Sequence, residues 1–264
     1  MDIYLWYNLL EEIMEKTIKD LKINYLDQGD FDNIAVFLHG WGASKETMVP
    51  IANLIKDRYR VVLIDLPGFG MSEEPKEVLN SYDYADYILD LIESLNITKA
   101  SFFGHSFGGK ISSIIAANHP EKVDKLILID SAGLIPKRGI SYYFKVYSYK
   151  AIKKFYKLLP IKNKEEKLEN FKKSRGSDDY QNSSGIMRKI MVTVVNENIA
   201  EDLKKIKADT LLIWGEDDDA TPLYLGKKFE QLIHKSGLVV LKNAGHFSYI
   251  DDYGTFSAVI NSYM

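Results

Sequence analysis

Short apolar runs alternate with amphipathic segments along most of this chain. Residues 110–118, for example, carry isoleucines at helical spacing and are predicted to form a helix. The alternation runs from about Lys19 to Asp130 and resumes near Asp209. Because this pattern is typical of βαβ units, we predict an α/β protein with a mostly parallel sheet. The runs that most clearly indicate buried strands are residues 100–103, 126–129, 211–214 and 239–241.

The pattern changes over residues 131–200. This stretch contains 15 Lys and Arg against six Asp and Glu, an excess of +9 that leaves −12 for the rest of a chain with net charge −3. A positive surface could attract anionic substrates or membranes. Lys on exposed helix faces more often only keeps an apolar segment soluble, and we favour that explanation. The apolar residues of the stretch are rich in aromatics, with Tyr142, Tyr143, Phe144, Tyr147, Tyr149, Phe155 and Tyr156 close together.

The first 16 residues predict a short amphipathic helix rather than a targeting segment. Ile3, Trp6, Leu10 and Ile13 fall on one helical face. The start is acidic and no small-residue cleavage site follows, which argues against a signal peptide. No run approaches the roughly 18 apolar residues that span a bilayer. We expect this helix to pack on the body or on a partner subunit, and the protein to be cytoplasmic without integral membrane association.

Length and composition fit one large domain. With 264 residues and 46% hydrophobic content, the chain can bury a single core or a core with an insertion. It has no cysteine, which excludes disulfides, thiolate zinc sites and a cysteine nucleophile. His and carboxylates are not clustered at metal-ligand spacing, so we predict neither a metal nor a cofactor. The net charge gives no reason to expect nucleic acid, and the oligomeric state stays open.

Ser106 stands at the centre of Gly-His-Ser-Phe-Gly, between a predicted strand and a predicted helix. This is the pattern of a nucleophile elbow, a sharp turn that needs small neighbours and exposes the serine Oγ at the carboxyl end of the strand. Gly104, Gly108 and Gly109 supply those neighbours. The N–H of Phe107 lies in the first turn of the helix and has no partner within it, so we predict that it donates to an oxyanion.

A serine nucleophile needs a general base and an acid that orients the base, and in this motif they follow in the order Ser, Asp or Glu, His. His246 follows one predicted strand, and an acidic loop containing Asp217, Asp218 and Asp219 follows another. Both loops lie past the carboxyl end of a strand, where open α/β sheets place their sites. Asp130, at the end of a further apolar run, is another candidate for the acid.

Five motifs, spread over nearly the whole chain, resemble those of the α/β-hydrolase superfamily. The resemblance implies a catalytic triad of Ser106, Asp218 and His246, because Asp218 has the spacing of the family's acid. It also implies that the Trp41 N–H is the second oxyanion-hole donor. Besides the elbow, the motifs are His39-Gly40-Trp41-Gly42, Asp65-Leu66-Pro67-Gly68-Phe69-Gly70-Met71-Ser72, Trp214-Gly215-Glu216-Asp217-Asp218 with Pro222 beyond it, and Gly245-His246.

The same resemblance implies the α/β-hydrolase fold, with a mostly parallel central sheet, helices on both faces and a helical lid inserted after the sixth strand. We therefore expect a core domain of residues 1–133 and 201–264. The lid, or cap, would comprise residues 134–200. Its aromatic side chains, Tyr142, Tyr143 and Tyr147 among them, are expected to set acyl specificity.

The elbow also satisfies the phosphate-loop pattern G-x-x-x-x-G-K, which ends here at Lys110. We reject a nucleotide site because Ile111 stands where that motif has the Ser or Thr that ligates Mg²⁺. A nucleotide site would also leave the acidic and histidine loops unexplained. The remaining histidines are expected to be structural, His39 and His105 through hydrogen bonds that stabilise their loops, and His119 and His234 as helix-end residues.

The sequence thus predicts a serine hydrolase that acts by acyl transfer on a small-molecule substrate, above all a carboxylesterase for small to medium uncharged acyl groups. Relatives with a serine nucleophile also include carbon–carbon bond hydrolases, lactonases, amidases and perhydrolases, and the sequence does not separate these. Ser106 argues against dehalogenases and epoxide hydrolases, which use an Asp nucleophile. The alternative of another class is a non-enzymatic ligand receptor, because a fold does not fix a function.

Overall fold

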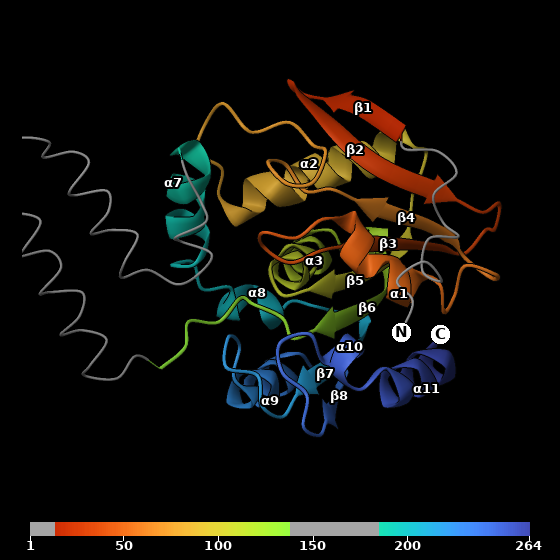
Figure 1. The fold of residues 1–264 in the computed structure, drawn as a ribbon, viewed down its shortest axis with the longest axis vertical. Coiled ribbons are helices and arrows are strands. Elements are labelled where there is room, and N and C mark those ends of the chain that lie inside the picture. Colours follow the sequence, from red (N-terminus) through yellow and green to blue (C-terminus); the bar gives the residue numbers. More distant parts are fainter. Residues whose placement is uncertain (1–13, 138–184) are drawn as a thin grey trace, which may run out of the picture.

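A computed structural model describes residues 14–137 and 185–264, and within them the chain forms one eight-stranded sheet (Figure 1). The strand order is β1-β2-β4-β3-β5-β6-β7-β8. The pairs β1–β2 and β2–β4 are antiparallel and the others are parallel, which confirms the mostly parallel sheet. The strands are β1 (Met14–Ile18), β2 (Leu21–Gln28), β3 (Ile34–Leu38), β4 (Arg60–Ile64), β5 (Ala100–His105), β6 (Val123–Ile129), β7 (Asp209–Gly215) and β8 (Ser236–Leu241).

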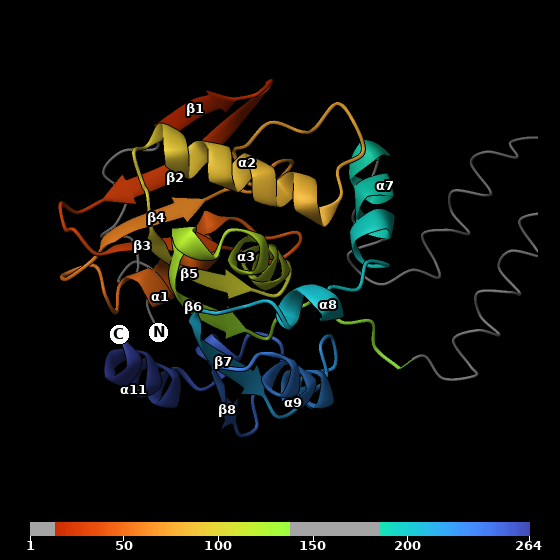
Figure 2. The same ribbon diagram turned by 180° about the vertical axis from the view of Figure 1, so that it is seen from behind.

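Helices cover both faces of the sheet (Figures 1 and 2). Helices α2, α3 and α9 bury their apolar residues in one core cluster, and α1, α10 and α11 bury theirs in a second cluster on the opposite face. The described helices are α1 (Val49–Ala52), α2 (Ser81–Ser94), α3 (Phe107–Asn118), α7 (Gly185–Val194), α8 (Ala200–Leu203), α9 (Leu223–Leu232), α10 (Ser248–Asp251) and α11 (Tyr253–Tyr263), with 3₁₀ turns at Lys45–Met48 and Pro120–Lys122.

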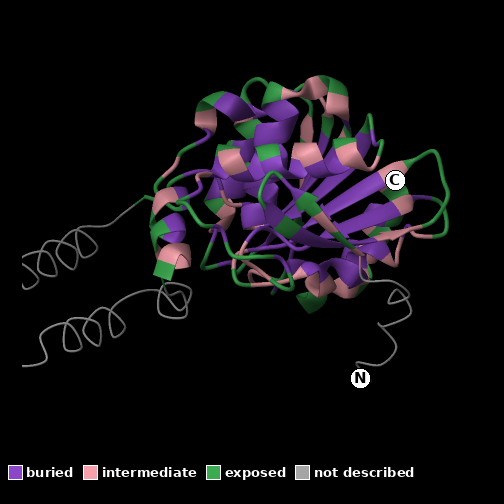
Figure 3. Cartoon of the chain, turned by 90° about the horizontal axis from the view of Figure 1, so that it is seen from above, coloured by how far each residue is buried: buried purple, intermediate pink, exposed green. Residues whose placement is uncertain are grey.

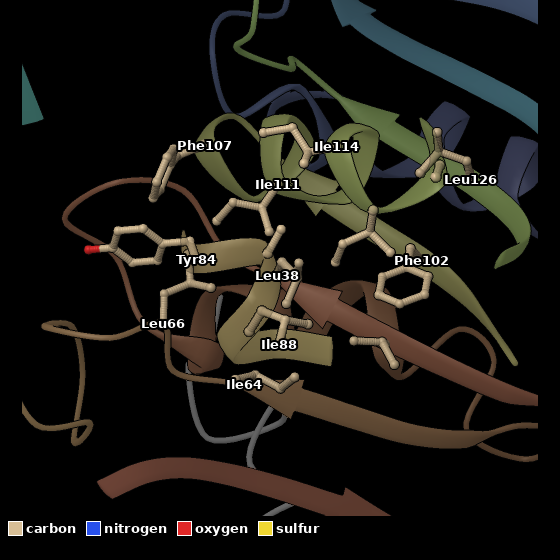
Figure 4. Packing of buried hydrophobic residues seen from close by; sticks show 14 of the residues in the cluster. Leu38, Ile64, Leu66, Tyr84, Ile88, Phe102, Phe107, Ile111, Ile114 and Leu126 are labelled. Atoms are coloured by element: carbon tan, nitrogen blue, oxygen red, sulfur yellow. The ribbon is translucent and has the colours of Figure 1, made fainter. Parts of the chain in front are cut away.

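The central strands are apolar on both sides because both faces are covered. Successive residues of β5 point to opposite faces, so Phe102 joins the first cluster and Phe103 the second. Figure 3 shows that the strands are buried along most of their length. Figure 4 shows Phe102 in the first cluster, close to residues of α2 and α3 such as Ile88 and Ile111. This packing fixes the carboxyl ends of the strands, from which the candidate site is built.

The N-terminal strand contradicts part of one prediction. Residues 14–16, which we predicted to lie in an amphipathic helix, belong to β1, where Met14 pairs with Tyr25 of β2. Burial alternates along β1, as a strand at the edge of a sheet requires. Hairpin pairing with β2 overrides the local helical pattern here. The rest of the predicted helix, residues 1–13, lies outside the described residues.

The chain between β6 and β7 spans residues 130–208, the place predicted for a lid. Helix α7 lies in the second half of this segment, where the chain leads back toward β7, and it stands beside the N-terminal end of α2 (Figures 1 and 2). Ile190 and Val194 of α7 are buried in the first core cluster. The aromatic cluster from Tyr142 to Tyr156 lies outside the described residues, so the division into core and lid stays a prediction. None of the described helices is long and apolar enough to cross a membrane.

Candidate active site

Ser106 occupies a tight turn between β5 and α3. Its backbone has φ 49° and ψ −110°, a conformation that L-residues seldom adopt. The turn is held by hydrogen bonds from the Ser106 N–H to the Ile129 carbonyl (3.0 Å) and from the Gly108 N–H to the His39 carbonyl (3.1 Å). A Cβ on Gly104 would lie 2.5 Å from the Gly108 oxygen, and a Cβ on Gly108 would collide with the Leu38 carbonyl. The glycines are therefore required by close packing of the turn.

His246 brings an imidazole to this turn from the loop after β8. Its Nε2 lies 2.9 Å from Ser106 Oγ, and its Nδ1 lies 2.9 Å from Asp218 Oδ2. A carboxylate can only accept, so Nδ1 carries the proton and donates it. Nε2 is then left with a lone pair that accepts the Ser106 hydroxyl. This is the tautomer in which the imidazole can remove the hydroxyl proton of Ser106.

The Asp218 carboxylate is fixed by its own loop. Oδ1 accepts the N–H groups of Ala220 (2.8 Å) and Thr221 (2.9 Å), and Oδ2 accepts the Thr221 hydroxyl (2.7 Å). Burial raises the pKa of Asp218, but hydrogen bonds from His246 and Thr221 outweigh burial and hold the pKa below its ordinary value. Asp218 therefore stays ionised at neutral pH. Asp217 and Asp219 are exposed, so the structure brings only the central aspartate of this loop to His246.

Asp130, the further candidate for the acid, is fully buried but bonds elsewhere. Its Oδ1 accepts the Gly215 N–H (2.8 Å), and its Oδ2 accepts the Ser248 hydroxyl (2.6 Å) and N–H (3.1 Å). Burial raises the pKa of Asp130 to about 7, although the bonds from Ser248 and Gly215 oppose the rise. Sequence reasoning missed Ser248, which belongs to none of the motifs, and Thr221, which lies between Asp218 and Pro222 at a position for which the acid-loop motif specifies no residue.

Of the two N–H groups predicted for the oxyanion hole, that of Trp41 lies on the loop after β3 and that of Phe107 on the first residue of α3. Within the described residues, neither the Trp41 N–H nor the Phe107 N–H donates to a backbone carbonyl. The rings of the two residues pack edge to face with centroids 5.5 Å apart, and the Trp41 ring also packs against Phe69 at 4.8 Å. Aromatic packing thus fixes the loop that carries one donor against the helix that carries the other.

Two buried histidines hold the loops around Ser106. His39 Nε2 accepts the Leu66 N–H (3.0 Å), so its Nδ1–H donates to the Gly40 carbonyl (2.7 Å). Burial lowers the pKa of His39. His105 Nε2 donates to the His246 carbonyl (2.8 Å), and burial lowers the pKa of His105 to about 3. Both imidazoles are therefore neutral supports.

The other two histidines lie at helix ends. His119 follows α3, and its side chain is 43% exposed and 3.7 Å from Glu121. His234 is exposed just past the end of α9. Neither histidine contacts Ser106, Asp218 or His246 through a hydrogen bond between described residues.

Two buried lysines near these loops are both ion-paired. Lys110, the lysine of the rejected phosphate-loop pattern, lies 3.1 Å from a carboxylate oxygen of Glu197. Glu197 also accepts the Ser81 N–H that begins α2 (3.2 Å), so this pair joins three segments. Lys45 lies 2.8 Å from Asp65 Oδ2. Lys110 thus serves as a tether between segments rather than as part of a phosphate cradle.

Comparison with known proteins identifies the family to which this chain belongs. The family of the alpha/beta hydrolase fold matches residues 35–253, so the chain belongs to this family. The chain is 28% identical over 227 residues to the uncharacterized hydrolase YugF of Bacillus subtilis (strain 168), covering 80% of this chain and 82% of that one.

Two further relatives carry names of activities. The 2-hydroxy-6-oxononadienedioate/2-hydroxy-6-oxononatrienedioate hydrolase of Escherichia coli O81 (strain ED1a) is 25% identical, with 95% of this chain and 93% of that one covered. The solved structure of an esterase from Exiguobacterium antarcticum is 25% identical with a TM-score of 0.72, covering 94% and 97%. The chain is thus a hydrolase of this family, similar to proteins of more than one activity.

Proposed function

We propose that this protein is a serine hydrolase that acts by acyl transfer, as a carboxylesterase on uncharged esters. The observation that carries the proposal is the chain of two hydrogen bonds, each 2.9 Å, from Ser106 Oγ through His246 to Asp218. Ser106 would be the nucleophile, His246 the general base and then acid, and Asp218 the group that orients and stabilises the imidazolium. The N–H groups of Trp41 and Phe107 would bind the oxyanion.

The steps follow from the tautomer. His246 Nε2 takes the proton as Ser106 Oγ bonds to the ester carbonyl carbon, whose oxygen becomes the oxyanion. The tetrahedral adduct collapses, the bond to the alkoxy group breaks, and Nε2 returns the proton to the leaving alcohol. Water then attacks the acyl-enzyme with the same general base, which releases the acid and restores Ser106. Asp218 remains ionised throughout and only accepts hydrogen bonds.

Among residues 14–137 and 185–264, the state of the two buried lysines favours an uncharged substrate. A dioate of the kind named for the Escherichia coli relative carries two carboxylates, which call for cationic side chains. Lys45 and Lys110 are each paired already with an acid, and removing either from its partner would strand a buried charge. Carbon–carbon bond hydrolysis is nevertheless the second candidate, because the similarity to that relative extends over almost the whole of both chains.

We further propose that residues 134–200 form the lid predicted from the sequence, with Tyr142, Tyr143 and Tyr147 in the wall that contacts the acyl group. The support is the position of this segment between β6 and β7, which begins beside the Ser106 turn. The Ala132 N–H donates to the Ser106 carbonyl at 2.9 Å, two residues before the proposed lid begins. An apolar wall distinguishes acyl chains by only about 1–3 kcal/mol per methylene, so the preference should be broad.

A covalent probe tests the nucleophile, and a substrate panel tests the reaction. A small fluorophosphonate should label the wild-type protein once, at Ser106, and Ser106→Ala should lose labelling and about 10⁴- to 10⁶-fold in ester turnover. Ser112→Ala, a buried serine of α3 that bonds the Gly108 carbonyl, is the matched control and should still be labelled. Turnover should also survive dialysis against EDTA, since no metal is invoked.

Nitrophenyl esters of increasing acyl length should be compared with a 2-hydroxy-6-oxo dienedioate under the same conditions. Faster turnover of the esters supports the carboxylesterase. Faster turnover of the dioate would transfer the proposal to carbon–carbon cleavage with the same nucleophile. Labelling that persists in Ser106→Ala, located at another residue by peptide mass spectrometry, would refute the nucleophile itself.

A further inference from the structure

Asp130 touches the loops that carry both partners of the proposed nucleophile. It follows β6, and its carboxylate bonds the Gly215 N–H on one side and the hydroxyl and N–H of Ser248 on the other. Gly215 stands three residues before Asp218, and Ser248 stands two residues after His246. The Asp130 side chain therefore joins the start of the Asp218 loop to the start of α10, the helix that follows the His246 loop.

The backbone of Asp130 adds two more links. Its N–H donates to the Ile213 carbonyl of β7 (2.9 Å), and its carbonyl oxygen lies 3.0 Å from the Thr221 hydroxyl oxygen. That hydroxyl also lies 2.7 Å from Asp218 Oδ2, the oxygen that His246 contacts. Asp130 adopts φ 46°, a left-handed conformation that costs a non-glycine residue about 1 kcal/mol or more. Such a conformation persists because the surrounding hydrogen bonds determine it.

The charge of Asp130 has no salt-bridge partner among residues 14–137 and 185–264. Its three donors are two backbone N–H groups and one hydroxyl, which reach the carboxylate from the end of β7 and the start of α10. An ionised carboxylate accepts from all three, whereas the NH₂ of an amide would face at least one of the two N–H donors. The arrangement of donors thus suits a carboxyl group with two acceptor oxygens better than an amide.

We propose that Asp130 is a positioning residue, which clamps the Asp218 loop and the His246 loop to the end of β6 and so sets the distances of the hydrogen-bond chain to Ser106. The proposal rests on the proposed roles of Ser106, His246 and Asp218. Asp130 does not contact the reacting atoms and acts only through its two neighbours. Catalytic geometry is sensitive to such support, since a misplacement of about 1 Å can cost roughly 10²-fold in rate.

The test is a double-mutant cycle on ester hydrolysis. Asp130→Asn should lower kcat about 10²-fold while KM changes less than about twofold, because alignment rather than substrate binding is lost. The rate of fluorophosphonate labelling should fall in parallel. Ser248→Ala removes the hydroxyl and keeps the N–H donor, so we expect about a tenfold loss. The matched control is Asp202→Asn, a buried aspartate of α8 bonded to Tyr82 and Lys205, which should keep wild-type kcat.

The cycle with Asp218→Asn separates positioning from a general loss of stability. If Asp130 acts through Asp218 and His246, then Asp130→Asn should cost less than about threefold once Asp218 is Asn, because the productive hydrogen-bond chain that it aligns is already broken by the reversed His246 tautomer. Equal losses in both backgrounds would overturn the proposal, as would a wild-type kcat for Asp130→Asn. If Asp130→Asn does not fold, the same cycle with Ser248→Ala decides. Failure of Ser106→Ala to abolish labelling would instead refute the proposed function, independently of the cycle.

Discussion

The Asp218→Asn variant should lose most of its activity because the structure dictates which way the amide must face. Asp218 Oδ1 accepts two backbone N–H groups, from Ala220 and Thr221. In the variant, the amide oxygen has to take that position, since an NH₂ there would face two donors. The NH₂ group is then placed where Oδ2 lies now, 2.9 Å from His246 Nδ1. The imidazole can accommodate a donor there only by making Nδ1 the acceptor.

That change reverses the tautomer of His246. Its proton moves to Nε2, which faces Ser106 Oγ at 2.9 Å and can no longer accept the hydroxyl proton. The loss is expected to be about 10⁴-fold in kcat, or roughly 5 kcal/mol in the barrier. Steric change is small, because Asn and Asp have the same shape. We therefore expect KM and thermal unfolding to stay close to the wild-type values.

Steady-state hydrolysis of a short-chain nitrophenyl ester is the assay. Asp217→Asn and Asp219→Asn are the matched controls, since both residues are exposed in the same loop, and each should keep kcat within about twofold. The argument is wrong if Asp218→Asn retains more than about a tenth of wild-type kcat in a folded protein. It is also wrong if Asp130→Asn loses more than Asp218→Asn, which would make Asp130 the acid.

Two further predictions concern stability. Gly108→Ala should lower the free energy of unfolding by about 3 kcal/mol, because the new Cβ would meet the Leu38 carbonyl. Gly254→Ala, at a position of α11 with open space around it, should leave stability unchanged or raise it by about 0.5–1 kcal/mol. Similar urea midpoints for the two variants would contradict the packing argument. Burial lowers the pKa of His105 from 6.5 to about 3, so the unfolded chain binds a proton that the native protein does not, and stability is lost as pH falls through this window. By about pH 4.5 the loss from this residue should reach about 3 kcal/mol, and the stability of His105→Gln should fall correspondingly less between pH 7 and 4.5. If the stability of the two proteins instead falls equally between pH 7 and 4.5, the prediction is wrong, because native His105 would then take up its proton at the same pH as in the unfolded chain.

The sequence was most informative where a short motif fixes its own geometry. The Ser106 turn could be predicted from the glycines that lie two or three positions away from it. The position of His246 could be predicted because it comes after a clearly apolar run, residues 239–241, that indicates a strand. Asp218 was preferred to its neighbours by spacing alone, and the structure buries it while Asp217 and Asp219 are exposed. In the structure, His246 lies within hydrogen-bonding distance of both Ser106 and Asp218. Along the chain the three residues follow in the order Ser, Asp, His, as the motif requires. Their catalytic role stays a prediction until it is measured.

Features that depend on pairing between distant segments could not be predicted. Residues 14–16 have a helical pattern, but antiparallel pairing with β2 decides their conformation. The partners of the Asp130 side chain, Gly215 and Ser248, are 85 and 118 residues away, and no local pattern links them to it. The contact of His105 with the His246 carbonyl likewise spans 141 residues. Local periodicity carries no information on which strand ends meet.

These long separations have a consequence for the order in which activity is acquired during folding. The turn at Ser106 is held by the carbonyl of His39, just after β3, and by the carbonyl of Ile129, at the end of β6. The imidazole lies 140 residues further along and is brought to the serine only when β8 pairs with β7. Contacts of such range form slowly. A refolding chain that has already closed the turn would therefore be inert toward esters, and the return of hydrolysis would mark the joining of the last strand to the sheet.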